Sequence, residues 1–137
     1  MDLNRFVLKM RLNKVQNCGI SAPILWSEVN KNLTAIQGYI NTQGATCWHV
    51  WCQDTHGNIE DVGFELAKRE DPSFANIDKE YIMVPPEGVQ VDKDPDVEER
   101  WEKYQRDSKG YWKTESQRLR DFKSHIMREA HGSANMH

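Results

Sequence analysis

The sequence lacks any apolar run long enough to span a bilayer. No run exceeds about five residues, whereas a transmembrane helix needs about 20 consecutive apolar residues. The apolar run nearest the start, Phe6–Leu8, is also too short for the core of a secretory signal peptide, and no small-residue cleavage site follows it. The sequence therefore predicts a soluble protein with no membrane contact and an intracellular, cytoplasmic location.

Cysteine is scarce as well, and neither sign of charge dominates. Three cysteines are an odd number without the spacing of a secreted disulfide scaffold, so reduced thiols are expected. The formal net charge of −3 gives no electrostatic reason to expect a nucleic-acid partner. Neither a glycine-rich phosphate loop nor a Cys-x-x-Cys pair occurs, so the sequence predicts no bound cofactor.

The overall composition is that of a single globular domain with a polar C-terminal end. Hydrophobic residues make up 38% and charged residues 28% of the 137 positions, proportions typical of a soluble globular chain. We expect an α+β core over residues 1–90 and a helical C-terminal extension over residues 91–131, packed on the core or on a partner. A frayed tail is expected over residues 132–137.

The N-terminal half mixes helical and strand periods. Alternation over Leu8–Leu12 predicts a half-buried strand, with a helix as the alternative. Ser21 and Pro23 predict the cap and the first turn of a helix that runs to about Asn32. Three strand-like runs follow, separated by short turns, and predict a small three-stranded antiparallel meander at residues 34–41, 46–53 and 59–63.

Two narrow apolar stripes mark the C-terminal extension. Asp94 and Pro95 predict a helix start. Each stripe then follows the helical period: the first comprises Val97, Trp101 and Tyr104, and the second comprises Leu119, Phe122 and Ile126. The fold class predicted is therefore α+β, a three-stranded meander with an N-terminal helix and two or three C-terminal helices. The stripes could instead join a protein partner, or a second copy of the chain in a homodimer.

Residues 47–61 form the chemically densest segment of the chain. They hold two of the three cysteines, two of the five histidines and two of the five tryptophans. Their pattern is that of a β-hairpin whose turn contains Gly57. A three-residue loop with Gly57 in the left-handed region is a common connection of this kind, and it pairs Cys52 with Glu60.

The register of the hairpin determines whether His49 and Asp61 lie on the same face of the sheet. With the three-residue loop, Trp51 lies opposite Asp61, and side-chain alternation places His49 on the same face as both. His49 and Asp61 are then diagonal neighbours with Cα atoms roughly 7–8 Å apart. A two-residue turn at His56–Gly57 instead places Cys52 opposite Asp61 and turns Asp61 away from His49.

A histidine oriented by an acid is the base half of a nucleophilic triad. The thiol candidate is Cys18, which lies just before the helix start at Ser21, and the partial positive charge of a helix N-terminus lowers the pKa of a nearby thiol. The order Cys18, His49, Asp61, within about residues 17–64, resembles the transglutaminase-like branch of papain-like cysteine hydrolases. This resemblance implies that Cys18 is the nucleophile, His49 the base and Asp61 the orienting acid. The substrate implied is an amide or thioester of an unidentified peptide or small molecule.

A zinc site is one alternative. Cysteine and histidine are the ligands zinc prefers, and the segment supplies Cys47, His49, Cys52 and His56. Alternation points Cys52 away from Cys47 and His49, so one ion reaches all four only across a bulge. A three-ligand site from Cys18, Cys47 and His49 is the other arrangement. No metal ligand is assigned.

A non-catalytic binding module is the second alternative. It would dock a protein partner through the tryptophan-rich sheet or through the C-terminal helices. Trp48 and Val50 on one face, with Trp51 on the other, predict a central strand that is covered on both sides. We expect the Ser21 helix on one face and the C-terminal helices on the other.

Overall fold

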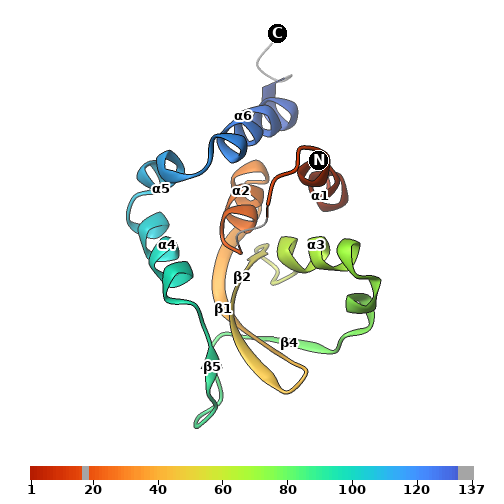
Figure 1. Cartoon of the computed structure of the whole chain (residues 1–137), viewed down its shortest axis with the longest axis vertical. Coiled ribbons are helices and arrows are strands. Elements are labelled where there is room, and N and C mark those ends of the chain that lie inside the picture. Colours follow the sequence, from red (N-terminus) through yellow and green to blue (C-terminus); the bar gives the residue numbers. More distant parts are fainter. Residues whose placement is uncertain (17–18, 133–137) are drawn as a thin grey trace.

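The computed structural model of the chain describes residues 1–16 and 19–132. Cys18 and most of the expected C-terminal tail, residues 133–137, lie outside the described residues. Within the described ranges the chain forms six α-helices, one 3-10 helix and five strands (Figure 1). None of these helices is long and apolar enough to cross a membrane. The α+β class is confirmed.

The sheet is built on a long hairpin. β1 (Thr34–Thr42) and β2 (Ala45–Gln53) pair antiparallel over their full length. β3 (Ile59–Glu60) returns against the end of β2, as the meander requires, but it is shorter than the strand expected at residues 59–63, because Asp61 caps α3 and residues 62–63 belong to that helix. Two strands were not predicted: β4 (Lys79–Ile82) pairs with the end of β1, and β5 (Val91–Asp92) runs parallel to the start of β2. Both are short and lack a distinct alternating pattern.

The N-terminal segment is a helix, α1 (Leu3–Leu12), so the strand expected at Leu8–Leu12 is wrong and its helical alternative is confirmed. The buried residues are Phe6, Val7 and Met10, which fall on one helical face. Leu8 and Leu12, which suggested the alternation, are 45% and 72% exposed.

α2 (Ser21–Val29) is the central helix of the core, with seven of its nine residues buried. Pro23 lies in the first turn as expected. Ser21, however, does not cap the helix: Ile20 holds the cap position without a side-chain bond. The Ser21 hydroxyl instead donates to Glu115 Oε1 at 2.7 Å and contacts the Tyr111 hydroxyl. The Ser21 hydroxyl is thus engaged by partners about 90 residues away along the chain, and it does not bond the first turn of its own helix.

α3 (Val62–Glu70) and the 3-10 helix η1 (Pro72–Asn76) connect β3 to β4. α4 (Pro95–Arg106), α5 (Ser108–Thr114) and α6 (Gln117–His131) end the described chain. α4 starts as predicted, because Asp94 accepts a bond from the backbone N–H of Asp96 at 2.9 Å and Pro95 occupies the first turn.

The C-terminal helices belong to the same hydrophobic core as the N-terminal ones. One buried cluster joins Phe6 of α1, Leu25 of α2 and Val50 of β2 to Trp101 of α4 and Phe122 of α6. The apolar stripes of the C-terminal helices therefore pack within the chain itself, with Val97 and Tyr104 only partly buried.

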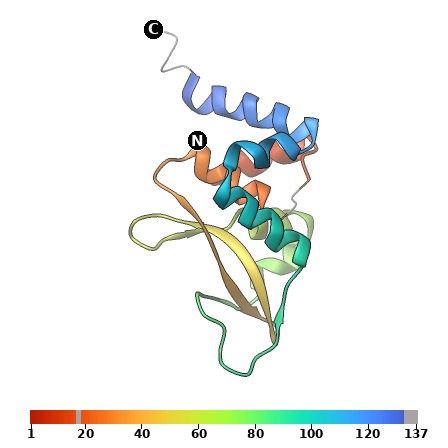
Figure 2. The ribbon, with the colours of Figure 1, turned by 90° about the vertical axis from the view of Figure 1, so that its left-hand side faces the viewer.

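The two faces of the hairpin are covered differently from the prediction. Cys52 lies against α2, where its thiol contacts the Pro23 carbonyl oxygen at 3.1 Å, and Trp48 packs at the edge of the same core near Trp101. α2 and the C-terminal helices therefore share one face of β2. Trp51 is 1% exposed on the opposite face, beside Tyr81 of β4, with their ring centroids 5.0 Å apart. α3 lies on the far side of the hairpin from α4 (Figures 1 and 2).

Candidate functional site

The hairpin turn adopts the three-residue loop on which the site depends. The N–H of Asp54 donates to the Asn58 carbonyl at 3.0 Å, and the N–H of Gly57 donates to the Asp54 carbonyl at 3.1 Å. Gly57 has a φ of +83°, in the left-handed region. Cys52 lies opposite Glu60, so the expected register is confirmed and the two-residue turn is wrong.

Asp54 fixes this turn through its side chain. Its carboxylate accepts bonds from the backbone N–H groups of His56 and Asn58, each at 2.9 Å, and from the Asn58 amide at 2.9 Å. The bonds from Asn58 and His56 lower the pKa of Asp54. The register is therefore set locally, by the kind of Asx interaction that favours aspartate in turns.

His49 and Asp61 meet as the register requires. His49 Nε2 lies 2.8 Å from Asp61 Oδ2. The same carboxylate oxygen accepts a bond from the Tyr81 hydroxyl at 2.7 Å. Asp61 Oδ1 accepts from the backbone N–H of Phe64 at 3.1 Å, because Asp61 is also the N-cap of α3. Three elements (β2, α3 and β4) therefore fix one carboxylate.

The electrostatics favour an ionised Asp61 in spite of its burial. Its side chain is 5% exposed, and burial alone raises its pKa. The bond and the charge of His49, together with the bonds from Tyr81 and Phe64, outweigh that effect and hold the pKa below its usual value. The pKa of Tyr81 is raised by burial and by the nearby negative charge of Asp61, so Tyr81 remains a hydrogen-bond donor.

Aromatic packing holds the histidine ring from one side. The His49 and Trp51 rings stack with centroids 6.1 Å apart and an interplanar angle of 24°. Trp51 lies over Gly38, which is opposite His49 in β1. A Cβ at position 38 would be 2.3 Å from Trp51 Cη2, so glycine is needed there for close approach. The His49 side chain remains 24% exposed.

Tyr81 and Gly38 were missed at the sequence level. A glycine within a strand signals close approach by a neighbouring group, and this signal was available for Gly38. Tyr81 had no such signal, since β4 joins the sheet only through the fold.

The predicted nucleophile, Cys18, lies outside the described residues. The next residue, Gly19, lines a pocket of about 390 Å³ together with His49 and its neighbours Trp48 and Val50. Strand β2 has an open side here. In the described part of the chain, β3 pairs with its end and β5 with its start, leaving residues 48–51 without a strand on that edge.

This open edge sets a geometric condition on any partnership with His49. α2 packs on the face of β2 that carries Cys52, as shown by the Pro23 contact. His49 points to the other face, with Asp61. A group on the α2 side of β2 can therefore approach the His49 side chain around the edge of β2 between β3 and β5, and Gly19 lies beside residues 48–50 there.

The two described cysteines differ in environment. Cys52 is fully buried, and desolvation, with the negative charges of Glu60 and Asp61, raises its pKa to about 12. A thiol with so high a pKa is a poor nucleophile near neutral pH, since the thiolate is the reactive form. Cys47 is partly buried and also unpaired by any disulfide.

The four ligands of the zinc alternative do not come together. Cys52 points into the helical core, whereas His49 points to the other face and is bound by Asp61. His56 lies in the exposed turn. Among residues 1–16 and 19–132, no group of three or more potential ligand residues is arranged to hold a metal ion.

Comparison with models of protein families gives no match. Comparison with curated proteins gives none, and comparison with solved structures gives none either. The resemblance to transglutaminase-like hydrolases therefore remains an inference from the order of Cys18, His49 and Asp61.

Proposed function

We propose that the chain is a small cysteine hydrolase or acyltransferase that acts on an amide or thioester. In this proposal Cys18 is the nucleophile, His49 the general base and Asp61 the acid that orients it. The observation that carries the proposal is the 2.8 Å contact between His49 Nε2 and Asp61 Oδ2 in a site that leaves the imidazole partly exposed.

The contact with Asp61 assigns a role to each ring nitrogen of His49. Asp61 engages Nε2, so Nδ1 is the nitrogen that takes the proton of the Cys18 thiol. The thiolate attacks the substrate carbonyl carbon, and the protonated His49 then gives the proton to the leaving amine or thiol. Water or a second acceptor, deprotonated by His49, releases the acyl group from Cys18. Asp61 holds the ring and stabilises the imidazolium throughout.

Two further features support this assignment. Gly19, next to Cys18 in the chain, lines the same pocket as His49. Cys18 also shortly precedes α2, which starts at Ser21, and a helix N-terminus favours the thiolate form of a nearby cysteine.

Alkylation by iodoacetamide near pH 6, mapped by mass spectrometry, tests the proposal. Cys18 should react at least about tenfold faster than Cys47 or Cys52, because only an activated thiol is substantially ionised at that pH. His49→Ala should remove this advantage. His56→Ala is the matched control, since it deletes an exposed histidine in the adjacent turn. Equal rates at the three cysteines, or an unchanged rate in His49→Ala, would exclude the triad.

A protein-binding module is the second candidate, and an exposed apolar loop favours it. Met83, Val84 and Val89 are 58%, 78% and 43% exposed. They lie between β4 and β5, in a loop that projects from the end of the sheet (Figure 2). Apolar side chains gathered on a projecting loop are typical of a contact surface.

Sedimentation analysis tests this second candidate through self-association. A mass that rises with concentration and returns to that of the monomer in Val84→Asp would support docking by the loop. A monomer at all concentrations would count against self-association through this surface.

A further inference from the structure

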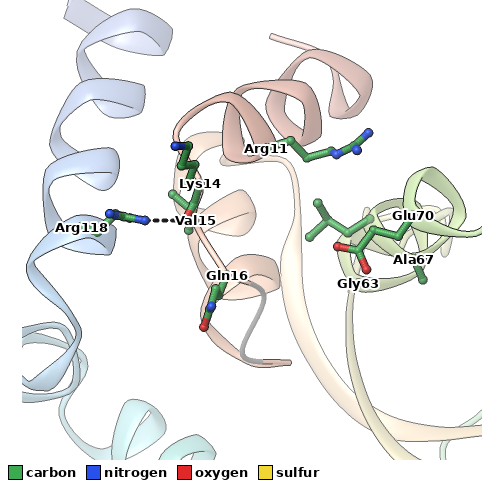
Figure 3. A pocket seen from close by; sticks show the side chains of 9 residues that line it. Arg11, Lys14, Val15, Gln16, Gly63, Ala67, Glu70 and Arg118 are labelled. Atoms are coloured by element: carbon green, nitrogen blue, oxygen red, sulfur yellow. Dashed lines mark hydrogen bonds between the residues drawn. The ribbon is translucent and has the colours of Figure 1, made fainter.

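A second cavity is larger than the pocket beside His49. Its volume is about 650 Å³, within the range of small-molecule sites. The end of α1, the following segment Lys14–Gln16, α3 and the start of α6 surround it (Figure 3). It shares no lining residue with the pocket beside His49.

Positive charge dominates the lining of this cavity. Arg11, Lys14 and Arg118 contribute three cationic groups, and Glu70 contributes one carboxylate. The formal charge of the lining is therefore 3 − 1 = +2, in a protein whose formal net charge is −3. Within the described ranges, none of the three cations forms a salt bridge, in contrast to Arg5 and Lys9, which both pair with Glu129.

The cationic groups are carried by separate elements. Figure 3 shows Arg11 extending from α1 toward α3, and Arg118 extending from α6 to the loop. Arg118 Nη1 donates to the carbonyl oxygen of Lys14 at 3.3 Å. This bond ties the guanidinium to the loop and uses one of its five N–H donors, so the others remain for a ligand.

The floor of the cavity is apolar. Val15 and Leu66 both line it and are only 8% and 6% exposed. A ligand that fills the cavity therefore meets apolar side chains as well as charge. The cavity volume also exceeds that of a small inorganic anion, which leaves room for an organic group.

We infer that this cavity binds the phosphate group of an organic phosphate monoester. A monoester carries a charge of about −1.5 to −2 at neutral pH, which matches the +2 of the lining. Guanidinium groups bind phosphate oxygens through paired N–H donors. The apolar part of the ester lies against Val15 and Leu66. Phosphate binding in this cavity does not require the proposed thiol chemistry.

Titration of the ¹⁵N-labelled chain with phenyl phosphate, followed by NMR, tests this inference. Saturable shifts are expected at the backbone amides of Gly63 and Ala67, which line the cavity. Benzoate is the matched probe, because it has the same apolar ring and only one negative charge. It should bind about tenfold more weakly, and phenyl phosphate should weaken as its second proton returns below about pH 6.

Variants assign the binding to the cationic groups. Arg118→Gln and Arg11→Gln should each weaken phenyl phosphate about tenfold. Arg128→Gln is the matched control, since Arg128 is exposed on the same helix as Arg118 and does not line the cavity. Arg11 donates no side-chain hydrogen bond within the described residues, so its replacement tests binding without disturbing the loop.

Three outcomes would overturn the inference: no saturable shift, equal affinities for benzoate and phenyl phosphate, or equal weakening in Arg128→Gln. A further titration with a short phosphotyrosine peptide distinguishes a phosphorylated protein from a small molecule as the ligand. Tighter binding of the peptide than of phenyl phosphate identifies a phosphorylated chain as the ligand. Equal or weaker binding of the peptide identifies a small molecule.

Discussion

Asp61 joins three elements through one buried carboxylate, so its removal should destabilise the fold well beyond the effect of a lost helix cap. Asp61→Ala deletes the acceptor for His49, for the Tyr81 hydroxyl and for the Phe64 backbone N–H. Alanine cannot replace any of these bonds. The cavity left by the carboxylate is small, so hydrogen bonding dominates the loss.

The expected loss in the free energy of unfolding follows from the three hydrogen bonds. Loss of an N-cap aspartate costs about 1 kcal/mol. An unsatisfied buried donor costs about 1–3 kcal/mol, and the low end applies to His49 and Tyr81 because both side chains keep some access to water. The total is about 3 kcal/mol. For a chain of this size, this lowers the melting temperature by about 10 °C.

Urea unfolding at pH 7, followed by tryptophan fluorescence, measures this loss. Asp94→Ala is the matched control, because Asp94 also caps a helix but is exposed. It should cost about 1 kcal/mol or less. Asp61→Asn should fall between the two, since its oxygen can still cap α3. If Asp61→Ala costs no more than Asp94→Ala, the carboxylate acts only as a cap and the reasoning about His49 and Tyr81 is refuted.

Three further predictions concern pH, packing and thiol reactivity. Because the pKa of Asp61 is lowered by folding, its stabilisation is complete above the unfolded pKa of about 3.9 and is lost as the pH falls through the folded value. The difference in unfolding free energy between the wild type and Asp61→Asn should therefore shrink as the pH falls below about 3.9. A difference that grows in acid would contradict this sign. Gly38→Ala places a Cβ within 2.8 Å of the Ile82 carbonyl oxygen and closer still to the Trp51 ring. It should therefore lower the free energy of unfolding by at least about 1–3 kcal/mol and shift the fluorescence emission of Trp51. A urea midpoint equal to that of the wild type would show that the contact is not tight. Cys52, with its pKa raised to about 12, should resist iodoacetamide at pH 8 until urea unfolds the chain, whereas rapid labelling of the folded protein would contradict its burial.

Features fixed by neighbours in the chain could be predicted. Asp94 and Pro95 start α4 because cap and first-turn geometry depend on adjacent residues. Asp54 and Gly57 set the hairpin register for the same reason. With the three-residue loop, which the sequence offered beside a two-residue turn, strand alternation placed His49 on the same face as Asp61.

Features that depend on distant partners could not be predicted. Ser21 resembles a helix cap, but Tyr111 and Glu115 engage its hydroxyl from the far end of the chain. Leu8 and Leu12 suggested a strand, yet helical packing of their neighbours leaves both exposed. The parallel pairing of β5 with β2 has no local signal, because only two residues take part.

The sequence by itself determined the α+β class and reduced the hairpin to two registers, of which only the three-residue loop pairs His49 with Asp61, since turn geometry and strand alternation are local. The structure has that loop. Only the tertiary structure placed Tyr81 on the same carboxylate and α2 on the face of β2 opposite His49. Only the tertiary structure also brought Arg11 and Arg118 to one cavity. These contacts join segments that are 20 to 107 residues apart, and the packing of a core, not the order of neighbours, decides which of them meet.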